Sequence, residues 1–296
     1  MTPSNPLHDE SGSTHLDSTA QIMDRITSRL GTQLSPTLVL VAHGSRDPRA
    51  LTTVTALAER IREQRPGLTV RLGHIELNEP LLTDTLAAQR PGSAVLVPLL
   101  LGRGQHVKRD IPAAAAGAPH LDIRVAAPLG PHPLLAEALH ARLVQAGWPE
   151  RPRGAGARRG HAVVLAAAGS RDPESAADTE TAAELLAERL GVPVLPAYAA
   201  PTAACPRTVP EALEALAAAG RTRTAVAAYF TAPGRFATQS AAAAPWIAAA
   251  PLGPHAALAR LVLHRYDQAR DRARDQARDQ ARTAPAPAPQ RRLTSV

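Results

Sequence analysis

The chain has 296 residues, with 33 Lys and Arg against 26 Asp and Glu, a single Cys and 2% aromatic residues. This length suits two domains of about 100–150 residues each. A hydrophobic content of 45% excludes a wholly disordered chain. The lone Cys205 excludes a disulfide scaffold and a Cys-rich metal site. Because no apolar run is long enough for a bilayer and no secretory signal is recognisable, we expect a cytoplasmic protein with no membrane partner.

The net charge of +7 is unevenly distributed along the chain. Residues 149–160 hold four Arg and one Glu, and residues 260–296 hold nine Arg and four Asp, so these two stretches account for the whole excess. The basic residues therefore gather in a linker and a tail rather than on a folded face. With so few aromatic side chains to stack on bases, we expect no nucleic-acid partner.

The first half of the chain has the pattern of a parallel sheet. Residues 1–35 are rich in Ser, Thr, Asp and Pro and are predicted to be disordered. Within 36–148, short apolar runs at 38–42, 69–77, 94–101 and 122–127 alternate with helical stretches near 48–64, 80–89, 107–116 and 133–146. This alternation predicts an α/β domain with an open parallel sheet and helices on both faces. Ligands of such sheets bind at the carboxyl ends of the strands.

The second half repeats the first. "LVLVAHGSRDP" (38–48) returns as "VVLAAAGSRDP" (163–173), and "APLGPHPLLAEAL" (127–139) returns as "APLGPHAALARLV" (250–262). Between them "VPLLLGRGQHV" (97–107) aligns more weakly with "AAYFTAPGRFA" (227–237). The repeat predicts a second α/β domain over 161–265, after a Gly/Arg/Pro-rich linker at 149–160.

The C-terminal stretch 266–296 differs from both repeats. It repeats "DQAR" with a period of four, which predicts a charged helical extension with Asp–Arg pairs such as Asp271–Arg274. "APAPAPQ" then predicts a disordered tail.

Comparison of the two copies separates histidines that are needed for the fold from histidines that are not. His43 ends the first strand and precedes Gly44, which suits a tight turn, and Asp47 and Pro48 cap the next helix. The second copy keeps the turn and the cap but has Ala168 in place of His43. The turn therefore does not require the imidazole, which favours a functional role for His43.

A second histidine shows the same divergence. His106 follows the third strand, just before a helix expected to start near Lys108, and its counterpart is Phe236. By contrast, His132 and His255 occur in both "GPH" motifs, which predicts a structural role such as helix capping.

The third candidate is Glu76, at the end of the second strand. Alternation along a strand places His74, Glu76 and Asn78 on one face, and the second copy has no acid in this segment. His74 has two interpretations, a third imidazole ligand or a solvent-facing strand residue, and Glu79 is an alternative acid near a helix start. Two imidazoles and a carboxylate suit Fe²⁺, Co²⁺ or Ni²⁺.

Cationic residues lie close to the two histidines in the sequence. Arg46, Arg103, Lys108 and Arg109 are candidates for charge-assisted bonds to carboxylates of a substrate. The alternative is that they are solvated charges at the edge of the sheet.

Together these motifs resemble the sirohydrochlorin chelatase family, the small class II chelatases of siroheme and cobalamin synthesis. The resemblance depends on "VAHGSRDP" with His43, "IELNEP" with Glu76 and "VPLLLGRGQHVKRDIP" with His106, and it covers about 36–265 as two tandem domains. It implies two chelatase-like α/β domains with the site in a cleft between them. The second domain is degenerate, since it lacks all three residues.

The same resemblance implies an activity and a set of roles. Family members insert Fe²⁺ or Co²⁺ into sirohydrochlorin without ATP or an organic cofactor, so the metal is a substrate. His43, His106 and Glu76 would hold it and serve catalysis, with Glu76 or one histidine as general base. Arg46, Arg103 and Lys108 would bind the tetrapyrrole. Which metal and which pathway apply stays open, and internal duplication makes a functional monomer plausible. The alternatives are a metal or tetrapyrrole carrier without turnover, and a regulatory module that acts through the basic tail.

Overall fold

The computed structural model describes residues 35–149 and 159–283. The predicted disordered segment 1–35, most of the linker and the tail beyond 283 therefore lie almost wholly outside the described residues. From Pro36 onward the chain forms one compact unit. In the first copy the elements are β1 (Thr37–Ala42), α2 (Pro48–Gln64), β2 (Val70–His74), α3 (Leu82–Ala87), β3 (Gly92–Pro98), the π-helix η1 (His106–Asp110), α4 (Ile111–Ala116), β4 (Leu121–Val125) and α5 (Pro133–Gln145).

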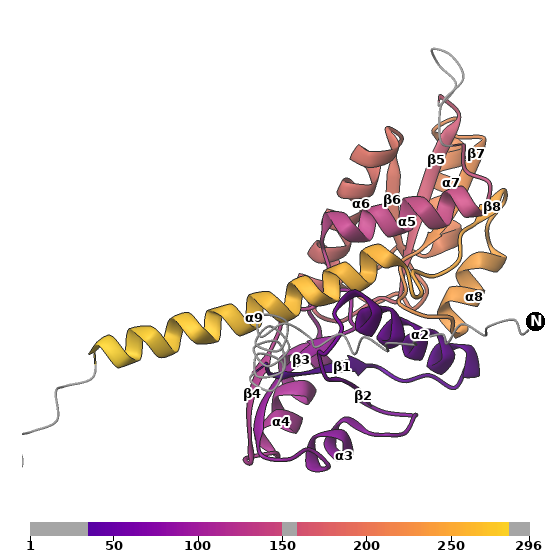
Figure 1. Ribbon diagram of the computed structural model, residues 1–296. Coiled ribbons are helices and arrows are strands. Elements are labelled where there is room, and N and C mark those ends of the chain that lie inside the picture. The colour runs from indigo at the N-terminus through magenta and orange to yellow at the C-terminus, as the bar shows by residue number, and fades with distance from the viewer. Residues whose placement is uncertain (1–34, 150–158, 284–296) are drawn as a thin grey trace, which may run out of the picture. The chain divides into compact units, whose positions relative to one another are not determined.

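The second copy repeats this order. Its elements are β5 (His161–Ala167), α6 (Pro173–Leu190), β6 (Val194–Tyr198), α7 (Val209–Ala218), β7 (Arg223–Ala228), α8 (Arg235–Ala242), β8 (Ile247–Ala248) and α9 (Ala256–Thr283). The two sheets have the orders β2-β1-β3-β4 and β6-β5-β7-β8, and every pairing is parallel. The predicted pair of similar α/β folds is confirmed (Figure 1).

The central strands of each sheet, β1 and β3 in the first and β5 and β7 in the second, are buried on both faces because they are mostly apolar. Along β1, Leu38 and Leu40 belong to one buried cluster, whereas Val39 and Val41 belong to another. The second cluster also contains side chains of α3 and α4, such as Leu86 and Ile111 on the opposite face from α2. Unbroken runs of β-branched and aliphatic residues are typical of parallel strands covered by helices.

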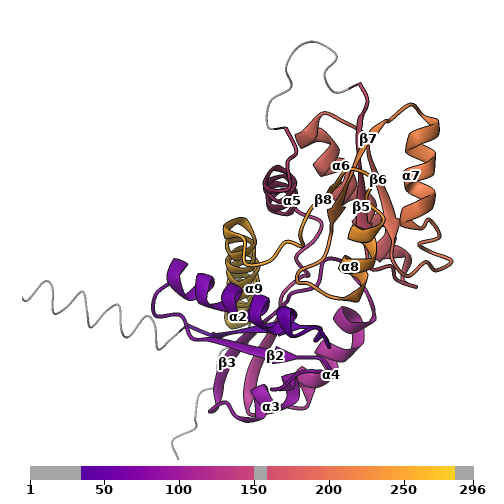
Figure 2. The ribbon, with the colours of Figure 1, turned by 90° about the vertical axis from the view of Figure 1, so that its right-hand side faces the viewer.

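The packing of two helices differs from the expected domain boundaries. α5, from the first copy, packs against α6 and β7 of the second copy, and α9, from the second copy, packs against α2, β3 and β4 of the first. Figure 2 shows α5 beside α6 on one side of the second sheet, with α7 on the other side. The copies therefore exchange their last helices, and neither sheet is fully covered by its own copy.

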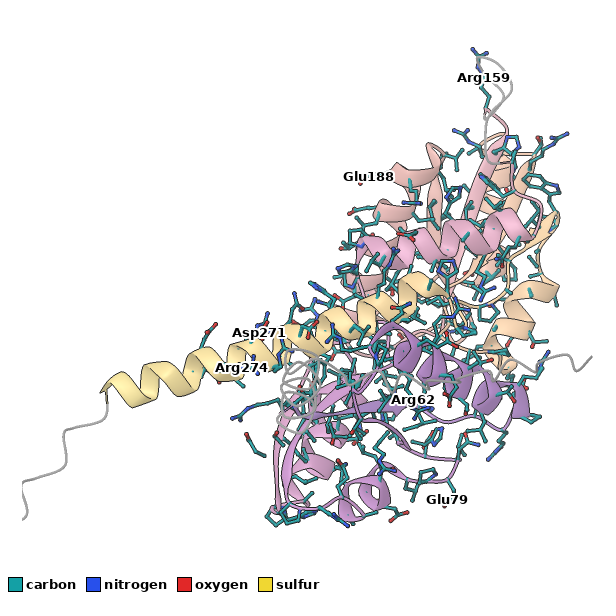
Figure 3. All side chains as sticks on the ribbon, in the orientation of Figure 1. Arg62, Glu79, Arg159, Glu188, Asp271 and Arg274 are labelled. Carbon is teal, nitrogen blue, oxygen red and sulfur yellow. The ribbon has the colours of Figure 1, made fainter. Side chains whose placement is uncertain are left out.

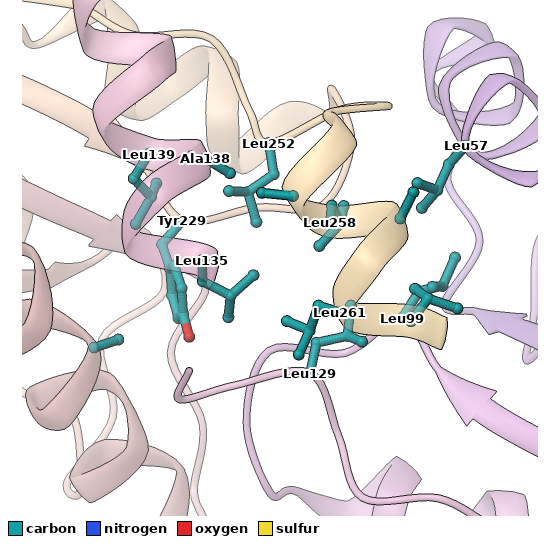
Figure 4. Close-up of a cluster of buried hydrophobic side chains, with 14 of the residues drawn as sticks. Leu57, Leu99, Leu129, Leu135, Ala138, Leu139, Tyr229, Leu252, Leu258 and Leu261 are labelled. Carbon is teal, nitrogen blue, oxygen red and sulfur yellow. The ribbon is translucent and has the colours of Figure 1, made fainter. Parts of the chain in front are cut away.

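One hydrophobic cluster runs through both copies as a result. Figure 4 shows Leu135 and Leu139 of α5 next to Tyr229, and Leu258 and Leu261 of α9 on the side of Leu99. All are at most 4% exposed. Burying a Leu side chain contributes about 1.5–3 kcal/mol, so this shared cluster couples the stabilities of the two halves.

The charged extension continues α9 without a break as far as Thr283. Tyr266 is 1% exposed and donates a hydrogen bond from its hydroxyl to Pro36 O. Asp267 forms two hydrogen bonds of 2.7 Å with Arg65, the residue directly after α2. Further along, Asp271 and Arg274 lie exposed on α9 (Figure 3). Asp271 pairs with Arg270 rather than with the predicted Arg274. No helix within 35–149 or 159–283 is long and apolar enough to cross a bilayer.

The two shared histidines cap helices, as predicted. His132 Nδ1 accepts from Leu134 N at 3.1 Å at the start of α5, and His255 Nδ1 accepts from Ala257 N at 3.1 Å at the start of α9. Desolvation by burial lowers the pKa of both imidazoles. Protonating Nδ1 would also remove the acceptor of each cap.

We expect His132→Ala to lower the free energy of unfolding by about 1 kcal/mol, the usual contribution of a cap, with a smaller effect on specific activity. Because the pKa of each imidazole is lower in the folded state, the imidazoles bind protons more readily in the unfolded state. The caps therefore contribute fully to the free energy of unfolding above the pKa of histidine in the unfolded state, and this contribution is lost as the pH falls below that value. Because His132→Ala removes one of the two imidazoles, its free energy of unfolding should fall less steeply with decreasing pH than that of the parent. Urea denaturation between pH 5 and about pH 8 measures both effects. An unchanged pH dependence would contradict the assignment.

Candidate functional site

His43 occupies the first position after β1, where the strand turns toward α2. Gly44 has φ +101°, and a Cβ on it would overlap the carbonyl oxygen of Glu76. Only glycine therefore allows the segment after β2 to lie directly against this turn. Asp47 then caps α2 by accepting from Arg49 N at 3.0 Å, with Pro48 at the first helical position, as predicted.

Glu76 lies in a loop and not on a strand, which corrects the predicted alternation. β2 ends at His74, and the loop is then held to the first turn by Glu76 N donating to His43 O at 3.1 Å. Leu77 has φ +68°, a left-handed conformation that no regular strand contains. Asn78 turns back to accept from Ser45 N through its side-chain oxygen at 2.7 Å.

This loop brings Glu76 to His43. His43 Nε2 and Glu76 Oε1 are 3.6 Å apart, and the two side chains are 45% and 51% exposed. His43 Nδ1 lies 3.1 Å from Gly44 O and donates to it in the neutral tautomer. The Nε2 lone pair then faces a carboxylate oxygen, an arrangement that a cation or a proton between them would stabilise. Two donor atoms bound to one ion at about 2.1 Å lie roughly 3.0–3.4 Å apart, close to the observed separation.

His106 is the first residue of η1, so its helix begins earlier than predicted. Its Nδ1 lies 2.6 Å from Asp110 Oδ2 and donates to that carboxylate in the neutral tautomer. This bond fixes the ring orientation and leaves the Nε2 lone pair available to a cation, an arrangement that is common among metal-ligating histidines. Asp110 was missed by the sequence reasoning, although its spacing of four residues from His106 in a predicted helix was a usable signal.

The side chains of His43 and His106 lie next to each other at the carboxyl ends of β1 and β3. Their ring centroids are 4.8 Å apart, with planes at 87°. The structure thus brings His43 into contact with both Glu76 and His106. Within the described part of the chain, however, no three His, Cys, Asp or Glu side chains converge closely enough to form a metal-binding group.

Of the two interpretations of His74, the solvent-facing strand residue is wrong, and the third imidazole ligand stays a prediction. Its side chain is buried, with the residue 1% exposed, so it is not a solvent-facing strand residue. Nδ1 lies 3.2 Å from Pro80 O, and Nε2 is buried without a hydrogen-bond partner. Desolvation lowers its pKa. Glu79, the alternative acid, is exposed and lies at the outer edge of the loop after β2 (Figure 3).

The predicted substrate-binding cations have different surroundings. Arg46 is exposed and makes no ion pair with a described residue. Arg103 pairs with Asp178 and Glu174, and Lys108 pairs with Asp172 and Glu174, so both contact the second copy. The hydrogen bond to Asp172 raises the pKa of Lys108. Arg109 is exposed. The sequence reasoning gave no sign of these contacts, because the partners lie about 70 residues away.

Equivalent hydrogen bonds identify the counterpart of each site residue in the second copy. Ala200 N donates to Ala168 O as Glu76 N donates to His43 O, and Gly169 has φ +96°. Thr238 N donates to Gly234 O as Lys108 N donates to Gly104 O, which places Phe236 opposite His106. The second copy thus keeps the backbone of the site with Ala168, Ala200 and Phe236 in place of His43, Glu76 and His106.

Several curated proteins that are similar to this chain are named as sirohydrochlorin chelatases. A sirohydrochlorin cobaltochelatase of Methanococcus aeolicus is 40% identical over 78 residues, which is 25% of this chain and 54% of the relative. A sirohydrochlorin cobaltochelatase of Sulfurisphaera tokodaii is 32% identical over 109 residues, covering 36% of this chain and 89% of the relative. A sirohydrochlorin ferrochelatase of Bacillus subtilis is 30% identical over 170 residues, covering 54% of this chain and 62% of the relative. The chain thus spans about half the length of several of the curated relatives it matches.

Solved structures share the fold. SirB from Bacillus subtilis with Fe³⁺ superposes with a TM-score of 0.63 at 23% identity, over 82% of this chain and 98% of that one. SirB from Bacillus subtilis subspecies spizizenii in complex with cobalt gives 0.62 at 22% identity, over the same shares. The CbiX family model matches residues 37–146 and again 162–269, once for each copy. The chain therefore belongs to the CbiX family, as two tandem copies of its domain.

Proposed function

We propose that this protein is a sirohydrochlorin chelatase, which inserts a divalent cation, Fe²⁺ or Co²⁺, into the tetrapyrrole without ATP or an organic cofactor. The observation that carries the proposal is the contact of His43 with both Glu76 and His106 at the carboxyl ends of β1, β2 and β3. Relatives named for this activity with cobalt and with iron support it. The metal is a substrate here, so its ligands must also release it.

Each side chain has a role that its environment favours. His43 and His106 hold the cation through Nε2, because Nδ1 of each has a hydrogen-bonding partner. Two imidazoles leave coordination positions open for the incoming pyrrole nitrogens. Insertion of M²⁺ releases two N–H protons, and Glu76, half exposed and beside His43, accepts them one after the other and passes each to solvent.

Turnover separates an enzyme from a carrier. We expect sirohydrochlorin and Co²⁺ or Fe²⁺ to yield many metallated products per protein, followed by the change in visible absorption. Product formation that stops at one equivalent would instead indicate a carrier. The same assay with the two metals side by side identifies the preferred cation.

Arg46 is the cation best placed to bind the substrate carboxylates, since it is exposed and unpaired among the described residues beside His43. Loss of one charge-assisted bond to a carboxylate costs about 1.5–3 kcal/mol. We therefore expect Arg46→Ala to raise KM for the tetrapyrrole about 10-fold with KM for the metal unchanged. Arg71, exposed on β2, provides a matched control as Arg71→Ala. Equal tetrapyrrole KM values in the two variants would contradict the role of Arg46.

A further inference from the structure

An ion cluster joins the segment that carries His106 to the second copy. Arg103 Nη2 lies 2.7 Å from Asp178 Oδ1, the backbone N–H of Arg103 donates to Asp178 Oδ2 at 2.8 Å, and Arg103 Nη1 lies 3.0 Å from Glu174. Lys108 Nζ lies 2.6 Å from Asp172 and also pairs with Glu174. The five residues are called the ion cluster below.

Asp178 makes this cluster more rigid than an ordinary surface ion pair. Its side chain is 5% exposed, and burying a carboxylate is costly unless it is hydrogen-bonded and paired. Here both oxygens accept from the Arg103 side chain, and one also accepts from the Arg103 backbone. Bidentate pairing of this kind fixes direction as well as distance. Arg103 is therefore held in one place relative to α6.

The position of the cluster along the chain relates it to His106. Arg103 precedes His106 by three residues and Lys108 follows it by two. Gly102 also lies against α6, since a Cβ on it would come 3.3 Å from Ser175 Oγ. Both sides of His106 are thus anchored to the N-terminal part of α6.

The two copies have diverged in a complementary way at this contact. In the second copy, the positions of Arg103 and Lys108 are occupied by Pro233 and Thr238, which carry no charge. In α2, the positions that correspond to Glu174 and Asp178 of α6 are occupied by Arg49 and Thr53, which are not acidic. The equivalent contact joins the segment before α8 in the second copy to the turn before α2 in the first. There Gly234 lies next to Ser45, and the described residues form no ion pair at this contact. Of these two equivalent contacts, only the one that carries His106 brings opposite charges together among the described residues.

We propose that Asp178, acting through Arg103, is a positioning residue for His106, and that the second copy serves the reaction by holding this segment. The inference rests on the proposed metal-binding role of His106 and extends it. In it, Arg103 and Lys108 orient the His106 segment instead of binding substrate carboxylates. Asp178→Asn removes the charge but keeps the size of the side chain.

Co²⁺ binding by the full-length protein tests the coupling between Asp178 and His106. Isothermal titration of the parent, Asp178→Asn, His106→Ala and the double variant gives four dissociation constants. We expect Asp178→Asn to weaken Co²⁺ binding by up to about 10-fold, the lower limit for losing a direct hydrogen-bonding partner of a metal ligand, because Asp178 acts on His106 through Arg103. In the His106→Ala background the same substitution should have no further effect. Glu184→Gln, an exposed change on the same helix, should leave the affinity unchanged.

The outcomes distinguish the two proposals. If His106→Ala leaves Co²⁺ affinity unchanged, the metal-binding role of His106 fails, and this inference fails with it. If His106→Ala weakens binding but Asp178→Asn has no effect, or an equal effect with and without His106, only the positioning role is overturned. Should Asp178→Asn not fold, Lys108→Gln removes two exposed ion pairs and is expected to give a smaller loss that also depends on His106.

The KM values for the metal and for the tetrapyrrole, measured separately, distinguish the positioning role from a general loss of stability. Arg103→Ala should raise KM for the metal and leave KM for the tetrapyrrole unchanged. A larger increase in KM for the tetrapyrrole would assign Arg103 to the substrate and overturn the proposal.

Discussion

Alanine at either His43 or His106 is expected to lower kcat/KM for metal insertion by about 100-fold or more. Loss of a hydrogen-bonding partner of a metal ligand already costs about 10- to 100-fold, so loss of the ligand itself should cost at least as much. Both side chains are substantially exposed, and neither is needed for the turn or the helix that carries it. The free energy of unfolding should therefore change by no more than about 0.5 kcal/mol.

His120→Ala is the matched control for this pair. His120 is exposed and lies just before β4, at the opposite end of the strands from the site. Its removal should leave metal insertion at the parent rate, as measured by visible absorption under steady-state conditions. Near-parent activity of both His43→Ala and His106→Ala would contradict their assignment.

Truncation within α9 should have the second large effect, because this helix covers the sheet of the other copy. A chain that ends at residue 255 loses Leu258, Leu261 and Tyr266 from the shared core. Loss of these three side chains should lower the free energy of unfolding by more than about 6 kcal/mol, which is comparable with the whole stability of a typical domain. We expect no cooperative unfolding transition for this chain by circular dichroism.

The end of the required segment can be located by two further truncations. A chain that ends at 265 lacks Tyr266 and Asp267 and should lose about 3–5 kcal/mol, whereas a chain that ends at 272 keeps both and should lose less than about 0.5 kcal/mol. Tyr266→Phe, which removes only the bond to Pro36 O, should cost about 1 kcal/mol. Equal stability of the chains that end at 265 and 272 would contradict this account of α9.

The contacts of Tyr266 and Asp267 extend the folded part beyond residue 265, after which the charged extension was expected to begin. The period-four repeat correctly predicts a helix, but it does not reveal that Tyr266 and Asp267 at its start contact Pro36 and Arg65. Loss of activity on removal of the tail would therefore support the regulatory alternative only if the deletion begins after Arg270, which pairs with Asp267.

Local features of the fold and the site were predictable because they depend on short-range chemistry. The turn at Gly44, the caps at Asp47 and His132, and the meeting of His43 with His106 all follow from residues close to strand ends. Comparison of the copies separated the histidines that cap helices from those of the candidate site, since Ala168 occupies the same turn as His43.

Features that depend on contacts between the copies were not predictable. The apolar faces of α5 and α9 specify burial but not which sheet they cover, so the exchange of these helices was missed. Asp178 was missed for a similar reason, since nothing in its own segment indicates Arg103 as partner. The loop position of Glu76 was not predictable, because β2 ends at His74 and Leu77 is left-handed, a conformation that a leucine between Glu76 and Asn78 does not suggest.

The cobalt position in crystals of the protein grown with Co²⁺ tests the central claim most directly. We predict an anomalous difference peak about 2.1 Å from Nε2 of both His43 and His106, with Glu76 within reach and nothing at Ala168 and Phe236. A cobalt peak away from both imidazoles, in crystals where the two side chains are ordered, would contradict the account.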